Sequence, residues 1–290
     1  TWAPDKPVGE LKARWAQTPS QFVAVAGMQV HLRDEGPRDD PTPIVLLHGT
    51  SASLHTWQSW TEALRGQRRV IRFDLPGFAL TGPHPQDDYS IDAYARFVVA
   101  VLDQLGVQKV VLGGNSLGGQ IAWATAAANP DRVAQLVLVD SAGYPFEPKS
   151  IPIGFKIARI PALASLMQTT LPRGMVESSV RNVYGDPAKV TPELVDLYYD
   201  MTVREGNRRA LGKRLAQPMA SAPERIASLK MPTLIIWGGQ DRLIPPDNAP
   251  RFAKDIAGSE LVMFDALGHV PHEEDPAATV AAVKKFLGMN

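Results

Sequence analysis

Apolar positions follow two alternating patterns along the chain. Short, nearly continuous apolar runs bounded by Gly or Pro are typical of strands buried on both faces of a sheet. Between them, apolar residues recur at helical spacing, as in 90–107, 117–130 and 275–287. The strand-like runs are a hairpin over 22–34 that turns near Gly27, then 43–49, 68–77, 108–115, 132–140, 232–239 and 260–268. This alternation predicts an α/β fold, with a mostly parallel twisted sheet covered by helices on both faces and an antiparallel hairpin at one edge.

One long region departs from this rhythm. From 144 to 222 no strand-like run occurs, and the stretch IGFKIARIPALASLMQTTL is amphipathic, rich in Leu, Ile and Met, and poor in charge. This pattern predicts a helical cap inserted after the sixth strand, with its apolar face lining a pocket. The expected organisation is an N-terminal extension at 1–20, an α/β core at 21–143 and 223–290, and a cap at 144–222.

The composition narrows the class of protein. The chain has 290 residues, of which 44% are hydrophobic and 21% charged, as in an ordinary globular protein. Lys+Arg and Asp+Glu both number 30, so the net charge is zero and no nucleic-acid partner is expected. The absence of cysteine excludes disulfides, thiolate metal sites and a cysteine nucleophile.

The first residues, TWAPDKPVGELKARWAQTPS, begin without methionine. Two interpretations are open: a trimmed chain, or one from which a signal or membrane anchor before Thr1 was removed. The second interpretation favours the bacterial envelope or periplasm over the cytoplasm as the location.

Four glycines surround Ser116 in the stretch VVLGGNSLGG, where a strand-like run meets a helical one. Gly114-Asn115-Ser116-Leu117-Gly118 is the G-x-S-x-G pattern in the strand–turn–helix context that presents a serine hydroxyl above a sheet. Small residues on both sides allow the chain to bend sharply. We therefore predict that Ser116 is a catalytic nucleophile.

A serine hydroxyl needs a base to take its proton, and a carboxylate must orient that base. His269 follows the last strand-like run and is the expected base, with His272 as a rival that we interpret as a solvated residue opening the last helix. Asp241, after the run 232–239, is the expected acid, and the order Ser, Asp, His is the one used by this kind of site. Asp140, at the end of another strand, remains an alternative acid.

Two backbone N–H groups are expected to stabilise the oxyanion: that of Leu117, which follows the nucleophile, and that of Thr50, after the strand PIVLLHG. His48 is interpreted as a structural residue of that loop, and Asp74 as bracing its own turn through backbone hydrogen bonds. We expect no cofactor and no metal, because no cluster of His and carboxylates has ligand-like spacing.

The blocks HGTSASLHTWQSW, FDLPGFALTG, GNSLGG, WGGQDRLIP and LGHVPHEEDP resemble, in order, those of α/β-hydrolase fold enzymes. The resemblance runs from about Phe22 to Leu287. GNSLGG is especially similar to the elbow of meta-cleavage-product hydrolases, which cleave carbon–carbon bonds in vinylogous diketones. The chain departs from those enzymes in its TSASLHT loop and in Val270, where they tend to have tryptophan. The serine at the elbow differs from the aspartate of haloalkane dehalogenases and epoxide hydrolases.

The resulting functional prediction is a carboxylic ester hydrolase that works through an acyl-enzyme on a small to medium hydrophobic ester. The alternatives are hydrolysis of carbon–carbon bonds in meta-cleavage-type diketones and, from another class, a non-catalytic protein that binds a small molecule on the same fold. The sequence predicts no particular oligomeric state. For either hydrolase, kcat/KM should rise with pH through one ionisation between about pH 6 and 7.5 and then reach a plateau.

Overall fold

Eight strands form one sheet in the computed structural model, which describes residues 1–218 and 221–290. The strands are β1 (Gln21–Val25), β2 (Met28–Glu35), β3 (Ile44–Leu47), β4 (Val70–Phe73), β5 (Val110–Asn115), β6 (Val133–Val139), β7 (Thr233–Gly238) and β8 (Glu260–Phe264). Their order across the sheet is β1-β2-β4-β3-β5-β6-β7-β8. The pairs β1/β2 and β2/β4 are antiparallel, and the pairs from β4 to β8 are parallel. The predicted fold class is confirmed, including the antiparallel hairpin at the edge.

Alternate residues of the central strands pack into two separate hydrophobic cores, one on each face of the sheet. Val45 and Leu47 of β3 face a core built with α3 (Ile91–Gln104), α4 (Leu117–Ala128) and α10 (Asn248–Asp255). Ile44 and Leu46 of the same strand face a second core built with α2 (Gln58–Leu64) and α12 (Pro276–Phe286). Both faces of the sheet are therefore buried, which explains why these strands read as continuous apolar runs.

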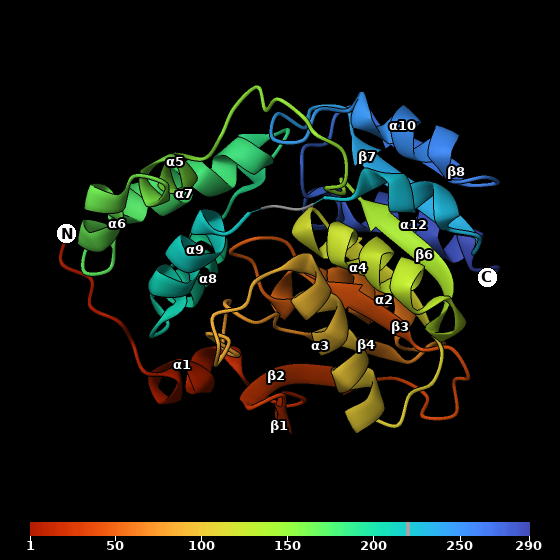
Figure 1. Cartoon of the computed structure of the whole chain (residues 1–290), viewed down its shortest axis with the longest axis horizontal. Coiled ribbons are helices and arrows are strands. Elements are labelled where there is room, and N and C mark those ends of the chain that lie inside the picture. Colours follow the sequence, from red (N-terminus) through yellow and green to blue (C-terminus); the bar gives the residue numbers. More distant parts are fainter. Residues whose placement is uncertain (219–220) are drawn as a thin grey trace.

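Between β6 and β7, the described residues form helices and no strand. These helices are α5 (Ile153–Ala158), α6 (Pro161–Met167), α7 (Arg173–Val183), α8 (Pro192–Val203) and α9 (Asn207–Ala216). Figure 1 shows them gathered beyond one end of the α/β core, as a layer of their own. The helical cap is thus inserted after the sixth strand. The predicted range 144–222 includes residues 219 and 220, which lie outside the described residues.

The N-terminal segment runs along this cap before it reaches the sheet (Figure 1). The backbone N–H of Ala3 donates to the carbonyl of Thr169, and that of Lys6 donates to the carbonyl of Val203. Helix α1 (Val8–Trp15) follows, and Nε1 of Trp15 donates to Asp200 in α8 at 2.8 Å. The N-terminal segment therefore holds the cap against the core.

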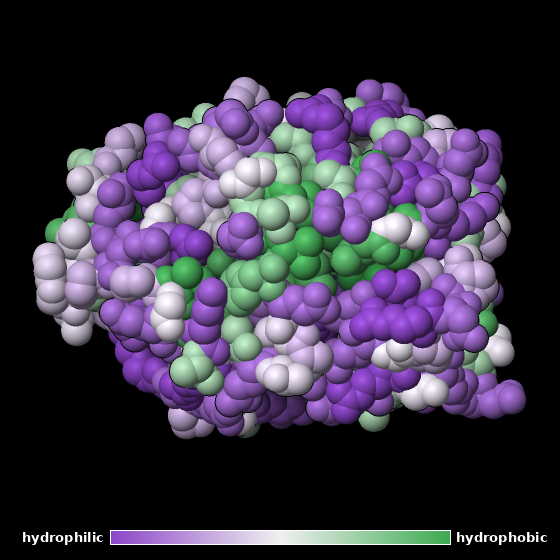
Figure 2. Space-filling model, turned by 90° about the horizontal axis from the view of Figure 1, so that it is seen from below, coloured by the Kyte–Doolittle hydropathy of each residue, from purple (hydrophilic) through white to green (hydrophobic). Residues whose placement is uncertain are grey.

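Polar side chains cover most of the face seen in Figure 2, with apolar residues gathered in a band across its middle. Several large apolar side chains that are exposed lie in the first residues and in the segment from α5 to α6, namely Trp2, Ile153, Ile160, Leu163 and Leu166. None of the described helices combines the length and the apolar character that a membrane crossing requires.

Candidate active site

Ser116 occupies a sharp turn between β5 and α4. Its φ is 56°, in the left-handed region that non-glycine residues rarely adopt, which indicates stored backbone strain. A Cβ on Gly114 would lie 2.1 Å from the carbonyl oxygen of Gly118, and a Cβ on Gly118 would lie 2.3 Å from that of Leu47. The glycines around Ser116 are therefore required by close backbone contacts. They let the chain fold back beside the serine.

The imidazole of His269 is hydrogen-bonded to the carboxylate of Asp241. Nδ1 of His269 lies 2.7 Å from Oδ2 of Asp241, and both side chains are almost completely buried. The other oxygen of Asp241 accepts the backbone N–H groups of Leu243 and Ile244, each at 2.9 Å. Three donors thus fix the orientation of this carboxylate, and one of them is the histidine.

The loop that carries His269 is anchored on both sides. The N–H of His269 donates to the carbonyl of Val183, at the end of α7, at 2.8 Å. Nδ2 of Asn115 donates to the carbonyl of His269 and to that of Val139, each at 3.1 Å. Asn115 therefore ties the serine turn, the end of β6 and the histidine loop together. Sequence reasoning treated it only as the variable position before Ser116, since nothing local indicates these distant partners.

Asp140, the alternative acid, lies one residue after β6 and is fully buried. Its carboxyl oxygens accept the backbone N–H of Gly238 at 3.1 and 3.3 Å. Burial raises the pKa of Asp140 well above its usual range, and the neighbouring Asp241 raises it further. It is Asp241, not Asp140, that contacts Nδ1 of His269.

Asp140, Asp241 and His269 also have the chemistry of metal ligands. One oxygen or nitrogen atom from each lies within 4.8 Å of the others. Nδ1 of His269 is already hydrogen-bonded to Asp241, so a metal bound through Nδ1 would have to break that bond.

A cavity of about 370 Å³ opens above Ser116. Ser116, His269 and the two residues expected to supply oxyanion donors, Thr50 and Leu117, all line it. Leu117 is the first residue of α4, so its N–H has no partner within the helix and belongs to the positive end of the helix dipole. The structure thus places all five predicted site residues together: four around one cavity and Asp241 behind His269.

The cap supplies most of the apolar wall of this cavity. The apolar lining residues from the cap include Phe155, Ala158, Ala164, Met167, Leu171, Met175, Val176, Val180, Val183, Leu211 and Leu215. Three arginines, Arg159, Arg208 and Arg214, also line the cavity, whereas none of its described lining residues is Asp or Glu.

Arg214 differs from the other arginines of the cavity. Arg208 pairs with Asp5 at 2.7 Å and Arg159 is exposed, but Arg214 is only 5% exposed. Within residues 1–218 and 221–290 its guanidinium makes no hydrogen bond or ion pair, and it lies 5.9 Å from the ring of Phe78. Burial lowers the pKa of Arg214, and nearby Arg159 lowers it further. A buried cation without a carboxylate partner makes this part of the cavity favourable for an anion.

His272 is not solvated, contrary to the sequence-based interpretation. It is 1% exposed, stacks on Trp57 with ring centroids 4.1 Å apart, and lies 2.8 Å from Oγ1 of Thr56. Burial lowers its pKa to about 3, and His269 lowers it further, so the ring stays neutral. It lies in the short helix α11 (Pro271–Glu274), before α12. Its place beneath Trp57 comes from a residue far away in the sequence, which local polarity cannot reveal.

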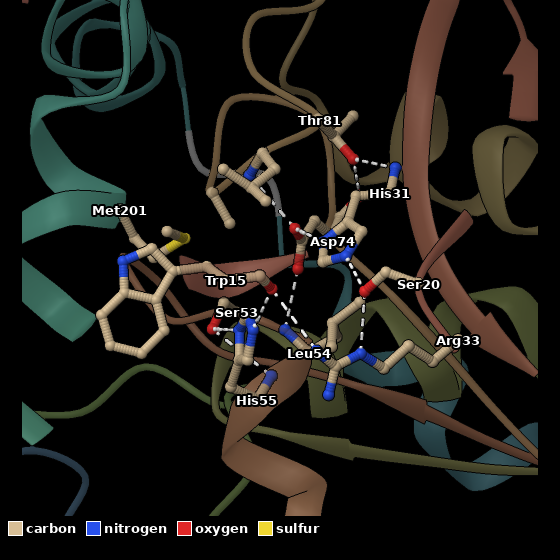
Figure 3. Close-up of polar contacts among 12 residues, drawn as sticks. Trp15, Ser20, His31, Arg33, Ser53, Leu54, His55, Asp74, Thr81 and Met201 are labelled. Carbon is tan, nitrogen blue, oxygen red and sulfur yellow. Dashed lines mark hydrogen bonds and ion pairs between the residues drawn. The ribbon is translucent and has the colours of Figure 1, made fainter. Parts of the chain in front are cut away.

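A second Ser–His–Asp series is formed by Ser20, His31 and Asp74 (Figure 3), none of which lines this cavity. Nε2 of His31 lies 2.7 Å from Oγ of Ser20, and Nδ1 of His31 lies 2.7 Å from Oδ2 of Asp74. Oγ of Ser20 also accepts Nε of Arg33 at 2.9 Å, and Asp74 accepts the N–H groups of Leu54 and Leu80. Asp74 thus braces its turn through backbone hydrogen bonds.

Comparison with known proteins places this architecture in a defined group. Residues 42–276 match the family model described as "alpha/beta hydrolase fold". The chain is similar to a 2-hydroxymuconate semialdehyde hydrolase of Pseudomonas sp. (strain CF600), at 30% identity over 91% of this chain and 92% of that protein.

The chain is also similar to solved structures of hydrolases. A meta-cleavage product hydrolase from Pseudomonas fluorescens IP01 is 26% identical, with a TM-score of 0.78, over 93% of this chain and 97% of that one. A thermophilic esterase from Thermogutta terrifontis is 25% identical, with a TM-score of 0.75, over 93% of this chain and 97% of that one.

Proposed function

Because the chain belongs to the α/β-hydrolase fold family, we propose that Ser116 is the nucleophile of a serine hydrolase. In this proposal Oγ of Ser116 attacks a carbonyl carbon of the substrate while Nε2 of His269 takes its proton. Asp241 holds Nδ1 of His269 and stabilises the imidazolium that forms. This assignment is supported by the strained turn at Ser116 and by the 2.7 Å contact between Asp241 and His269.

The negative charge that develops on the carbonyl oxygen would be stabilised by the backbone N–H groups of Thr50 and Leu117. The imidazolium of His269 then gives its proton to the leaving group. Water, activated by the same histidine, releases the acyl group from Ser116. The net reaction adds OH to the acyl carbon and H to the leaving group.

For the substrate, we propose a diketone that carries a carboxylate and is cleaved at a carbon–carbon bond. The observation that carries this choice is Arg214, a buried guanidinium that lines the cavity without a carboxylate partner. It agrees with the names of relatives, such as the 2-hydroxy-6-oxo-2,4-heptadienoate hydrolase of Pseudomonas putida, 28% identical over 92% of this chain and 95% of that protein. The sequence alone ranked ester hydrolysis first, and these observations reverse that order.

Hydrolysis of a hydrophobic carboxylic ester is the second candidate. It is supported by the apolar side chains that the cap contributes to the cavity and by Val270, which lines it directly after His269. The same residues would perform both reactions, since each begins with attack on a carbonyl carbon and differs in the bond that breaks.

The test is a comparison of two substrate classes with the purified protein. A ring-fission diketone bearing a carboxylate is assayed beside neutral p-nitrophenyl esters of graded chain length, with Ser116→Ala as the background. We expect kcat/KM to be highest for the diketone. A clear preference for the neutral esters would leave the serine mechanism in place and overturn the carbon–carbon assignment. No turnover of either class would favour a protein that binds a small molecule without catalysis.

Arg214→Met sharpens this test because Met keeps an unbranched apolar stem in place of that of Arg and removes the charged guanidinium. If Arg214 binds the substrate carboxylate, KM for the diketone should rise by about tenfold or more, the effect of losing a hydrogen bond to a charged group. The neutral esters should be affected much less. Lys213→Met, an exposed change in the same helix, is the matched control. Equal losses on both substrate classes would argue against an anion at Arg214.

A further inference from the structure

Two buried carboxyl groups lie side by side next to the catalytic histidine. Asp140 follows β6 and Asp241 follows the neighbouring strand β7, so both emerge at the same edge of the sheet. Both are almost completely buried, and a carboxyl oxygen of each lies within 4.8 Å of the other and of a ring nitrogen of His269. The proposed mechanism uses Asp241 and leaves Asp140 without a role.

The two carboxyl groups differ in the number of hydrogen-bond donors that contact them. Asp241 accepts three donors: the N–H groups of Leu243 and Ile244, and Nδ1 of His269. Asp140 accepts the N–H of Gly238. Two adjacent buried carboxyl groups cannot both ionise without strong repulsion, so the proton stays on the group with fewer donors. That group is Asp140.

We propose that Asp140 is a positioning residue, whose protonated carboxyl group donates a hydrogen bond to the Asp241 carboxylate and keeps it aligned with His269. The proposal rests on the proposed function, because it concerns how Asp241 acts in the serine mechanism. Asp140 touches neither the substrate nor Ser116 in this role. It acts through Asp241 alone.

The surroundings of Asp140 are consistent with a neutral carboxyl group at neutral pH. Burial raises its pKa, as do Asp241, through its charge and a hydrogen bond, and Glu274 of α11, whereas the N–H of Gly238 opposes the shift. The carboxylate of Glu274 is itself occupied by the N–H groups of Gly185, Asp186 and Gly268. As the pH rises through this raised pKa, Asp140 loses its proton and becomes an anion beside Asp241.

This loss changes the pH profile expected from the sequence. Instead of an alkaline plateau, kcat/KM should fall on the alkaline side, because the second negative charge repels the Asp241 carboxylate and disturbs its contact with His269. The fall belongs to Asp140, so a side chain that donates a hydrogen bond but cannot ionise should remove it.

Asp140→Asn is that variant. The amide keeps the shape, its NH₂ can donate to Asp241, and its oxygen can accept the N–H of Gly238. Asn also tolerates the φ of 45° found at Asp140. Asp140→Gly suits the same φ and removes the donor altogether. Asp131→Asn, an exposed change in the short turn just before β6, is the control for charge alone.

The experiment measures kcat and KM against pH for the wild type and the three variants, on whichever ester or diketone is turned over. We expect Asp140→Gly to lower kcat by about tenfold or more with little change in KM. Asp140→Asn should restore most of that loss at neutral pH and lack the alkaline fall. A wild-type plateau, or the same alkaline fall in Asp140→Asn, overturns the proposal. If Asp140→Gly does not fold, the wild type and Asp140→Asn still decide it.

A second measurement is independent of turnover. The proton between Nδ1 of His269 and Asp241 should give a far-downfield ¹H NMR resonance, which would be identified by its loss in Asp241→Asn. We expect this resonance to broaden with rising pH in the wild type and to persist in Asp140→Asn. If no substrate is turned over but the resonance behaves as expected, the proposed function fails while the role of Asp140 as a positioning residue stands. A resonance with the same pH dependence in both proteins overturns that role.

Discussion

Two Ser–His–Asp series occur in this molecule with the same contact distance and opposite surroundings. In both, Nδ1 of a histidine lies 2.7 Å from a buried aspartate. Ser116 lines a cavity on a strained turn. Ser20 is half-buried, and its Oγ accepts a hydrogen bond from Arg33 in a network whose groups pair with one another (Figure 3). The difference indicates that these three residue types alone would not make the active site proposed at Ser116. Space above the serine and N–H groups aimed at that space are also needed.

The largest expected effect separates the two serines. Ser116→Ala should lower kcat by about 10⁶-fold if it removes the nucleophile, the loss measured for such a residue in the best-studied case. Ser20→Ala should leave kcat within about threefold, since it removes two partly buried hydrogen bonds of a structural network that does not line the cavity. The measurement is steady-state turnover, with thermal melting to show that both variants are folded. If Ser116→Ala retains more than about a tenth of the wild-type activity, Ser116 is not the nucleophile.

The two aspartates should differ in the same way, with a smaller kinetic effect. Asp241→Asn should lower kcat by about 10⁴-fold, because an amide favours the wrong tautomer of His269. Asp74→Asn should instead lower the melting temperature, since Asp74 holds His31 and the backbone N–H groups of Leu54 and Leu80. Both quantities are measured on both variants. If Asp140→Asn lowers kcat strongly and Asp241→Asn lowers it only slightly, the acid is Asp140, at the end of β6, and not Asp241.

The sequence predicts the sharp turn at Ser116 because everything that marks this turn is local. A buried strand, two glycines at fixed positions and a helix start all lie within a few residues of the serine. The same holds for the strands of the core, whose burial on both faces makes them continuous apolar runs. Local pattern was sufficient where local backbone geometry creates the feature.

The sequence predicts Asp241 as the acid but leaves Asp140 as an alternative. Both residues follow parallel strands, and those strands turn out to be neighbours in the sheet. Sequence order favoured Asp241, but only the side-chain geometry shows which oxygen meets His269. The pairing of the two carboxyl groups was not foreseen at all.

His272 and Arg214 are two polar residues whose burial the sequence does not predict. Each is polar in sequence, and each is buried by residues far along the chain: His272 by Trp57 and Arg214 by the packing of the cap on the core. Periodicity indicates which face of a helix is apolar, but it does not say which distant side chain covers a polar residue. The sequence pattern therefore does not predict that a buried positive charge lines the cavity, because this depends on how the cap packs on the core.

The smallest expected effect is on the unfolding free energy at low pH, which should depend on Asp74 but not on the carboxyl group of Asp140 beside Asp241. Burial alone would raise the pKa of Asp74, but the charge and hydrogen bond of His31 outweigh it and lower the pKa to about 2. An unfolded aspartate titrates near ~3.9. A folded-state pKa below the unfolded value means that stability is fully present above about pH 4 and is lost as the pH falls toward 2.

The difference of about two pKa units corresponds to roughly 2–3 kcal/mol of unfolding free energy. Asp74→Asn should therefore be less stable than the wild type at neutral pH and should lose less stability between about pH 4 and 2. Asp140→Asn should show no such flattening, because the raised pKa of Asp140 keeps that group protonated throughout this range. Urea unfolding at a series of pH values measures both slopes. If the unfolding free energy falls equally between about pH 4 and 2 in the wild type and in Asp74→Asn, His31 and Asp74 do not form a stabilising ion pair in this pH range. The expected difference between this network and the site at Ser116 would then be wrong.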